Sequence, residues 1–312
     1  MRILFAGSPD IAVPSLEALV AAGHTIAGVL TNPPAPRGRG LGVSSTAVAT
    51  AAGRLGLPVL SPDRLGKEER DTIAALNPEL LVVFAYGRIF GPKFMALFPR
   101  GGINAHPSLL PRWRGCAPIP FAILNRDPVT GVSIQRVSAR VDAGDVLKQS
   151  IIDLDGTETT ETLSAVSGRL GAELLCQVVD AIQSGTERGV SQDESAATYS
   201  RELSKDDGRI DWAGAAIDLD ARVRALVPWP LAFTSLGPDR LAILESRPYP
   251  DEGDGAAPGT VISVDKSRGI MVQTGHGLMA ILRLQLQGKK AMGFKDFANG
   301  ARGLVGTLLD TP

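Results

Sequence analysis

The chain has 312 residues, of which 44% are hydrophobic, and a formal net charge of -1. This length allows one large domain or two ordinary ones, and the balanced charge argues against nucleic-acid binding over the whole surface. The two cysteines, Cys116 and Cys176, lack pairing or metal-ligand spacing, which favours a reduced compartment. With no signal-peptide pattern and no apolar run near the roughly 20 residues of a membrane span, we expect a soluble, cytoplasmic protein that contacts no membrane.

The first segments predict an α/β fold. Residues 2–7 and 25–31 have the pattern of strands, and residues 14–22 between them have helical spacing. A β-α-β opening implies parallel strands with right-handed crossovers, as in Rossmann-like domains. Gly7 stands alone, so the three-glycine fingerprint of dinucleotide binding is missing and a nicotinamide cofactor is not indicated. Further helices are expected at 44–55, 66–76 and 117–124, and strands at 58–60, 130–137 and 146–154.

Residues 32–45 interrupt this pattern with three prolines and a Gly-rich, Arg-containing stretch. Their composition predicts an irregular loop that is too long for an idle turn. Arg37 and Arg39 have no acidic residue near them in sequence, so they are available to meet phosphate. A solvated surface loop explains the same residues, and their own pattern leaves both interpretations open.

Two neighbouring strands carry the strongest chemical signal. Residues 80–86 form an apolar run typical of a strand buried on both faces, and residues 102–106 follow as the next strand. Asn104 and His106 are two residues apart, so both side chains point to one face near the carboxyl end, where open α/β sheets bind ligands. An amide donor beside an imidazole suits an acyl-transfer centre. The alternative is a strand end with incidental polar residues.

A turn downstream adds carboxylates. Asp142 and Asp145 flank Gly144 between the predicted strands at 130–137 and 146–154. Asp142 is the preferred candidate for the site, and Asp145 is the local rival, read as a surface acid. His24 and His276 are interpreted as structural or solvated. No His, Cys or carboxylate cluster has ligand spacing, so no metal is expected.

The second half of the chain changes character after a long amphipathic helix. That helix is expected over 159–182, with an apolar stripe of Leu163, Val166, Leu170, Leu174, Val178 and Ile182. We expect a catalytic domain at 1–184, a polar linker at 185–207 and a small domain at 208–312. Strands at 231–236, 240–247, 259–264, 270–274 and 278–286 predict an OB-like β-barrel. Its last part has a local basic patch of seven basic residues between Asp265 and Arg302 against two acidic ones: Lys266, Arg268, Arg283, Lys289, Lys290, Lys295 and Arg302.

At this point the chain resembles a known family. Asn104-x-His106-Pro107-Ser108-Leu109-Leu110-Pro111, with Asp142-x-Gly144 downstream, is similar to the signature of folate-dependent formyltransferases. Four further pieces resemble segments of the methionyl-tRNA formyltransferase family, and the similarity runs from Met1 to Pro312. These pieces are Gly38-Arg39-Gly40, Leu203-Ser204-Lys205, Pro228-Trp229-Pro230 and Gly288-Lys289-Lys290-Ala291-Met292.

The resemblance implies transfer of the formyl group of 10-formyltetrahydrofolate to the α-amine of initiator methionyl-tRNA. A monomer is our default expectation. Asn104 and His106 would stabilise a tetrahedral intermediate and Asp142 would assist proton transfer, while the acceptor of the amine proton, His106 or Asp142, stays open. The implied folate contacts are Phe84, Ala85, Tyr86, Gly87, Ser108, Leu109, Leu110 and Pro111. The implied tRNA contacts are Arg37, Arg39, Lys289 and Lys290.

The sequence also departs from the family pattern. Residues 41–45 replace expected lysines and a proline in the loop after Gly40, and Cys116 replaces a small alanine-type residue. Two alternatives stay open: a formyltransferase acting on a nucleotide-sugar amine, and a non-catalytic tRNA- or folate-binding protein on the same scaffold. The isomer of the Leu110–Pro111 peptide bond is also open.

Overall fold

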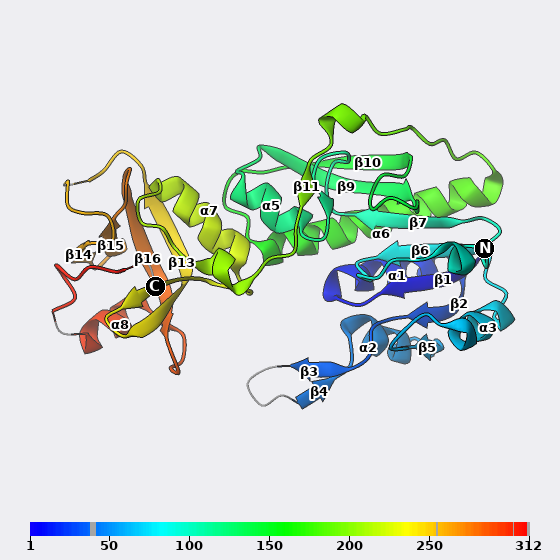
Figure 1. Cartoon of the computed structure of the whole chain (residues 1–312), viewed down its shortest axis with the longest axis horizontal. Coiled ribbons are helices and arrows are strands. Elements are labelled where there is room, and N and C mark those ends of the chain that lie inside the picture. Colours follow the sequence, from blue (N-terminus) through cyan, green and yellow to red (C-terminus); the bar gives the residue numbers. More distant parts are fainter. Residues whose placement is uncertain (38–41, 254, 302, 311–312) are drawn as a thin grey trace. The chain divides into compact units, whose positions relative to one another are not determined.

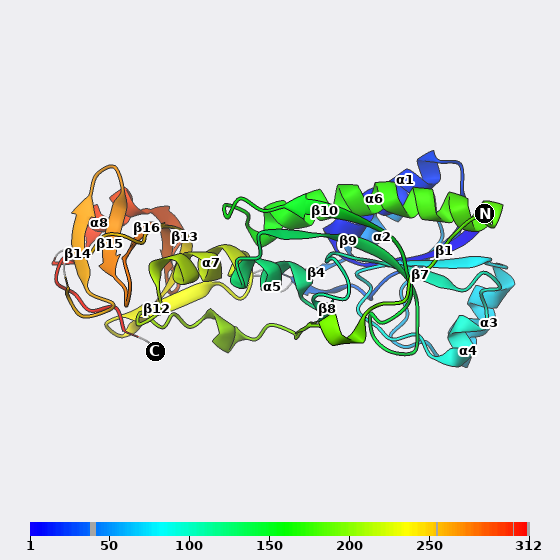
Figure 2. The same cartoon turned by 90° about the horizontal axis from the view of Figure 1, so that it is seen from above.

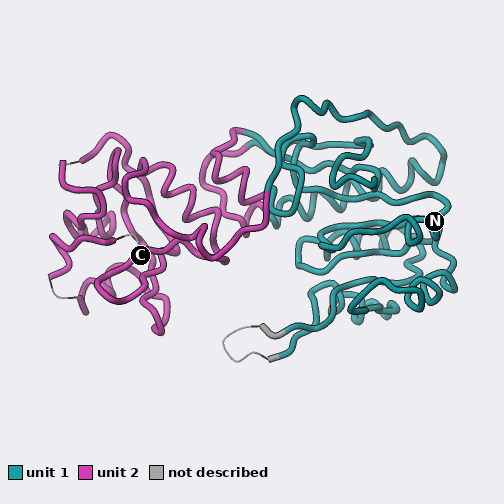
Figure 3. The backbone as a smooth tube through the Cα atoms, viewed as in Figure 1, with its two compact units in different colours: residues 1–118, 129–153, 164–200 teal, residues 119–128, 154–163, 201–312 magenta. Residues whose placement is uncertain are grey.

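The computed structural model describes residues 1–37, 42–253, 255–301 and 303–310. The chain forms two compact units, each with its own core (Figure 3). The first unit comprises Met1–Pro118, Val129–Asp153 and Ser164–Ser200. The second comprises Ile119–Pro128, Leu154–Leu163 and Arg201–Pro312. Residues 185–200, which the composition assigns to a linker, therefore lie in the first unit.

The first unit is built on a seven-stranded sheet, as the α/β prediction requires (Figure 1). Five neighbouring strands pair in parallel, and at one edge a sixth strand pairs antiparallel with them and a seventh pairs antiparallel with the sixth. The mostly parallel sheet is thus confirmed. In spatial order the strands are β10 (Val146–Asp153), β9 (Val129–Arg136), β7 (Gly102–His106), β6 (Leu80–Phe84), β1 (Arg2–Gly7), β2 (Thr25–Leu30) and β5 (Val59–Leu60).

Helices cover both faces of this sheet because its central strands are apolar on both sides. Along β1, Ile3 and Phe5 join one core cluster, whereas Leu4 and Ala6 join another. Figure 2 shows α1 and α6 on one side and α3 and α4 on the other. The helices with residues in these clusters are α1 (Val13–Ala21), α2 (Ala47–Arg54), α3 (Lys67–Ala75), α4 (Pro92–Met95) and α6 (Thr160–Ser184).

The predicted stripe of α6 is right except at one position. Leu163, Leu174, Val178 and Ile182 are buried, but Val166 is 37% exposed. The buried face passes through Ser167 and continues past Gly168 and Gly171. A Cβ on Gly168 would lie 2.9 Å from the carbonyl oxygen of Ile11, so the helix approaches its neighbour too closely for larger side chains. A prediction from hydrophobicity alone therefore placed Val166 on the buried face, where the adjacent Ser167 lies instead.

The loop expected at 32–45 contains regular structure. β3 (Ala35–Arg37) and β4 (Gly42–Ser44) pair antiparallel as a short hairpin, so the prediction of an irregular loop was wrong for these residues. Arg39 lies outside the described residues. Two-residue strands β8 (Arg114–Gly115) and β11 (Tyr199–Ser200) also pair, in parallel, and the sequence pattern did not predict them.

The second unit contains an antiparallel sheet with order β12-β13-β16-β15-β14, and β17 pairs with β16. Its five long strands confirm the expected segments. Isolated bridges join the end of the chain to Ser235 and to Thr260, while closure of the sheet into an OB-like barrel stays a prediction. The strands are β12 (Ala232–Leu236), β13 (Asp239–Tyr249), β14 (Val261–Asp265), β15 (Gly269–Gln273), β16 (Leu278–Leu286) and β17 (Met292–Gly293), with helices α7 (Ala216–Leu226) and α8 (Phe294–Gly300).

Among the described residues, no helix combines the length and the apolar composition that crossing a bilayer requires.

Candidate active site

The carboxyl end of β7 carries the two polar side chains that the sequence singled out. Asn104 and His106 both line one cavity, and Ala105 between them also belongs to a core cluster. Asn104 lies opposite Gln135 of β9, and His106 lies opposite Ser133. Strand alternation therefore places an amide and an imidazole on the same side of the sheet edge, as predicted.

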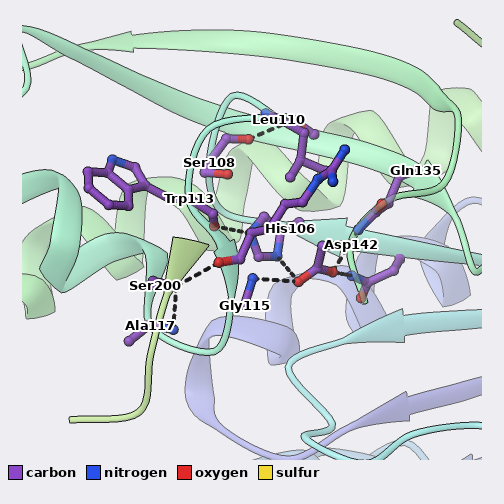
Figure 4. Close-up of polar contacts among 12 residues, drawn as sticks. His106, Ser108, Leu110, Trp113, Gly115, Ala117, Gln135, Asp142 and Ser200 are labelled. Atoms are coloured by element: carbon purple, nitrogen blue, oxygen red, sulfur yellow. Dashed lines mark hydrogen bonds and ion pairs between the residues drawn. The ribbon is translucent and has the colours of Figure 1, made fainter. Parts of the chain in front are cut away.

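His106 is only 4% exposed, and its ring has a polar neighbour at each nitrogen. Its Nε2 lies 2.8 Å from the carbonyl oxygen of Trp113, and its Nδ1 lies 3.6 Å from Oδ2 of Asp142 (Figure 4). A carbonyl oxygen can only accept, so Nε2 donates its hydrogen to Trp113. Nδ1 is therefore the nitrogen that faces Asp142 and can exchange a proton.

The Asp142 carboxylate is held by donors from three segments. The Gly115 N–H donates to Oδ2 at 2.9 Å, and Gln135 Nε2 donates to Oδ1 at 2.8 Å. Asn104 Nδ2 is 3.4 Å from the same Oδ1, a long and weak contact. A carboxylate with only 11% of its side chain exposed requires such partners. Asp142 and His106 thus meet, although they are far apart in sequence.

The turn that presents Asp142 has an unusual backbone. Asp142 has a φ of 50°, in the left-handed region that residues other than glycine rarely adopt. A Cβ on Gly144 would lie 1.9 Å from the carbonyl oxygen of Arg136, so this position requires glycine for space. Asp145, the rival acid, is exposed and accepts a hydrogen bond from Ser191. It is not among the residues that line the cavity.

The cavity beside these residues encloses about 560 Å³. Of the predicted folate contacts, Ala85, Tyr86 and Gly87 line it. Phe84 is fully buried in the core next to Gly171, and it does not line the cavity. Residues 108–111 also stand outside the lining. The sequence reading missed other cavity residues that follow the end of β6 or of β9, a position that was the available signal: Arg88, Ile89, Phe90, Val137, Ser138, Ala139 and Val141.

Tyr86 belongs to a core cluster and also lines the cavity. Its side chain is 1% exposed, and its ring stacks on Phe90 with centroids 5.5 Å apart. Its hydroxyl has no hydrogen-bond partner among the described residues. Burial raises the pKa of this phenol, and the nearby charge of Arg88 opposes the rise.

Residues 108–111 instead form a loop that is held by hydrogen bonds from Ser133 and Gln149. The Ser133 hydroxyl donates to the carbonyl oxygen of Ser108 at 2.6 Å and accepts from the Leu110 N–H at 3.0 Å. Gln149 donates to both Ser133 Oγ and the Leu110 carbonyl oxygen. The Leu110–Pro111 peptide bond is cis. The direct folate contact of Ser108, Leu109, Leu110 and Pro111 remains a prediction.

A buried arginine, Arg114, lies next to the site residue Gly115 but does not line the cavity. Arg114 is fully buried and donates to both carboxylate oxygens of Glu194, at 2.9 and 3.2 Å. Arg140 donates to the same carboxylate at 2.7 Å. Hydrogen bonds from Arg114 and Arg140 lower the pKa of Glu194 to about 2. The sequence reading missed this group because Glu194 lies in a segment with the composition of a linker.

The predicted RNA contacts are only partly described. Arg37 ends β3, and Arg39 lies outside the described residues. Lys289 and Lys290 are exposed in the second unit, between β16 and β17. Within the basic patch, Arg268 is paired with Glu252 at 2.7 Å, and Arg302 is outside the described residues. Among the described residues, no group of three His, Cys, Asp or Glu side chains could hold a metal ion.

Comparison with known proteins shows which family this chain resembles. Residues 1–179 match the formyl transferase family, and residues 202–302 match the formyl transferase C-terminal domain. The chain is 46% identical over 310 residues to the methionyl-tRNA formyltransferase of Treponema pallidum, covering 96% of this chain and 97% of that one. It is 42% identical to the Methylococcus capsulatus methionyl-tRNA formyltransferase, with 100% of both chains covered.

Solved structures share the fold at lower identity. HypX from Aquifex aeolicus in complex with tetrahydrofolic acid has a TM-score of 0.65 at 15% identity, covering 97% of this chain and 48% of that one. An N-formyltransferase from Helicobacter canadensis, in complex with folinic acid and dTDP-3-aminofucose, has a TM-score of 0.65 at 18% identity, covering 90% and 99%. With two matched domains and full-length relatives above 40% identity, the chain belongs to the formyltransferase family of enzymes.

Proposed function

We propose that this enzyme transfers the formyl group of 10-formyltetrahydrofolate to the α-amine of initiator methionyl-tRNA. The observation that carries the proposal is the meeting of Asn104, His106 and Asp142 at one wall of a cavity. The full-length similarity to methionyl-tRNA formyltransferases supports the choice of acceptor. The expected product is formylmethionyl-tRNA for translation initiation, made in the cytoplasm by a monomer.

The reaction develops negative charge on the formyl oxygen. Attack by the free amine forms a new C–N bond and a tetrahedral intermediate, and its collapse breaks the bond to N10 of the folate. Asn104 is suited to donate to the developing oxyanion because its present contact with Asp142 is long, at 3.4 Å. One such donor is typically worth about 10²–10³ in rate.

The same step moves a proton from the attacking amine to the leaving N10. His106 Nδ1 faces the cavity group Asp142, whereas Nε2 is engaged by Trp113. Both Asp142 oxygens already accept N–H donors. We therefore assign the proton transfer to Nδ1 of His106, worth about 10²–10⁴ in rate, with Asp142 fixing the ring and balancing its charge.

The cavity is suited to the folate donor. Its volume of about 560 Å³ falls in the usual range of roughly 300–1,000 Å³ for small-molecule sites. Aromatic and aliphatic side chains after β6 form one wall, and Asn104, His106 and Asp142 give it a polar part. The folate reactive atom would lie at this polar part. We propose Ala85, Tyr86 and Gly87 as its contacts from the β6 end.

The acceptor contacts are proposed from the sequence resemblance and the exposure of the lysines. Lys289 and Lys290 are exposed and carry no ion pair among the described residues. We propose that these two lysines, with Arg37 and Arg39, contact the tRNA. The proposed division is a catalytic domain at 1–184 and an RNA-binding domain at 208–312, joined by a linker at 185–207 whose residues 185–200 pack with the first unit.

One formyl-transfer assay separates this function from its rivals. The purified protein is incubated with 10-formyltetrahydrofolate and either charged initiator tRNA or a dTDP-amino sugar. Formylation of the methionyl-tRNA alone supports the proposal. Formylation of the sugar amine alone would show that the acceptor is an amino sugar and not methionyl-tRNA. If neither acceptor is formylated, the protein is a non-catalytic binding protein.

A further inference from the structure

A glutamine from the segment at 185–200 reaches the turn that carries Asp142. Gln192 Nε2 donates to the carbonyl oxygens of Asp142, at 2.9 Å, and of Gly144, at 2.7 Å. Its Oε1 accepts from Arg114 Nε at 3.0 Å. Gln192 does not line the cavity. The Gln192 amide therefore joins the Asp142 turn to Arg114 without lining the cavity.

Arg114 fixes which way this amide points. A guanidinium can only donate hydrogen bonds, so the Gln192 oxygen must face Arg114 and the NH₂ group must face the two carbonyl oxygens. Arg114 is itself fully buried and held by both oxygens of Glu194. The three residues form a fixed chain of contacts from Glu194 to the turn.

The turn has a geometry that needs such support. Asp142 is in the left-handed region, with a φ of 50°, and Gly144 packs directly against the Arg136 carbonyl. A backbone of this kind persists when its surroundings hold it in place. Gln192 donates to the carbonyl at each end of the three-residue turn, so it opposes rotation of the segment that aims the Asp142 carboxylate.

We infer that Gln192 is a positioning residue for the reaction, acting through Asp142. The inference rests on the proposed function, because it assigns Gln192 the task of keeping the carboxylate at His106 Nδ1. Loss of the amide donors should let the turn move while the substrate-lining residues stay the same. Misplacement of a catalytic group by about 1 Å is typically worth about 10²-fold in rate.

The first experiment compares Gln192→Glu and Gln192→Leu with a control, Ser191→Ala. The glutamate keeps the contact with Arg114 but sets an oxygen against the carbonyls of Asp142 and Gly144. Ser191 is the adjacent residue, exposed, and donates to Asp145 outside the site. We expect kcat to fall by about 10–10²-fold in both Gln192 variants, with the KM values for folate and tRNA little changed and Ser191→Ala equal to wild type. Changes confined to KM would overturn the inference.

A double-mutant cycle tests whether Gln192 acts through Asp142. In an Asp142→Ala background, Gln192→Leu should cause no further loss of kcat, because the group that it positions is gone. A general structural role predicts losses that multiply, and that outcome would reject the inference. Thermal unfolding of each variant establishes that the compared proteins are folded.

Hydrogen–deuterium exchange supplies a readout independent of the reaction. Amides of residues 138–146 should exchange faster in Gln192→Leu than in wild type, and at the wild-type rate in Ser191→Ala. Unchanged exchange in Gln192→Leu would overturn the positioning role. A protein that fails to formylate methionyl-tRNA but shows the faster exchange would reject the proposed reaction while keeping Gln192 as the support of the turn.

Discussion

His106 Nδ1 lies 3.6 Å from Asp142 Oδ2, and one short loop fixes both partners. The Trp113 carbonyl accepts from Nε2 of the ring, and the Gly115 N–H donates to Oδ2 of the carboxylate. Arg114, which lies between Trp113 and Gly115 in the chain, is fully buried. The relative position of the imidazole and the carboxylate is therefore set by residues 113–115 together with the support of the turn.

The three residues at the polar part of the cavity should be required for turnover. We expect Asn104→Ala, His106→Ala and Asp142→Ala each to lower kcat by at least about 10²-fold. The three changes remove, in turn, the oxyanion donor, the proton-transfer group and the carboxylate that fixes that group and balances its charge. Rapid-quench formylation assays measure kcat, and circular dichroism checks folding. Asp145→Asn is the matched control for Asp142 and should retain activity. Near-normal turnover in any of the three variants would remove that residue from the mechanism.

Gly144→Ala should damage both stability and activity. The added Cβ would lie 1.9 Å from the Arg136 carbonyl oxygen, so the turn must move away from β9. Forcing extra volume into a packed site typically costs about 1–3 kcal/mol. Gly53→Ala is the matched control, because nothing lies within 4 Å of its added Cβ in α2. Denaturant titration measures both variants, and equal stabilities for the two would contradict the close packing at Gly144.

The sequence predicted the parts of the site that follow a strong local rule. Strand alternation placed Asn104 and His106 together, and the end of a parallel strand placed them beside the cavity. The sheet itself followed from the apolar runs. Asp142 was found through a turn with glycine, although the space requirement at Gly144 comes from a contact with Arg136 that no local pattern encodes.

The supporting glutamines could not be predicted in the same way. Gln135 sits on a strand and Gln192 in a polar segment, and an amide side chain in either place has no periodic signal. Their roles depend on which carbonyl or carboxylate the folded chain brings within reach. The exposed Val166 has a related cause, because close helix packing favours the small Ser167 and Gly168 over a larger apolar residue.

The acid stability of the first unit should depend on Glu194. Its folded pKa is about 2, lowered by Arg114 and Arg140 from the ordinary value of 4.5. Its contribution is thus fully present above about pH 4.5 and is lost as pH falls toward 2, because the unfolded chain binds the proton first. We expect the melting-temperature gap between wild type and Glu194→Gln to be constant from pH 7 to 5 and to narrow below 4.5. The effect should be modest, since Glu194 is half exposed and salt screens it. A gap that stays constant down to pH 3 would contradict this reasoning.

Arg39 should affect the acceptor more than the chemistry. If it contacts RNA phosphate, Arg39→Ala will weaken the use of methionyl-tRNA, while formylation of a small amine acceptor is less affected. Arg54→Ala is a control, because Arg54 is an exposed arginine paired with Glu17 at 3.1 Å. Steady-state kinetics with both acceptors measure the difference. Equal losses on both acceptors would rule out the RNA-contact role.

Lys289 and Lys290 should contribute to the salt dependence of tRNA binding. A lysine that neutralises a phosphate releases bound counterions, so each substitution to alanine should reduce the slope of log affinity against log salt by about 1. Arg268→Ala is the matched control in the same basic patch, because Glu252 already pairs with that arginine at 2.7 Å. Filter-binding titrations with charged tRNA from low to moderate salt give the slopes. If Lys289→Ala and Lys290→Ala leave the slope at the wild-type value, the two lysines belong to a solvated surface and the RNA contact must lie elsewhere.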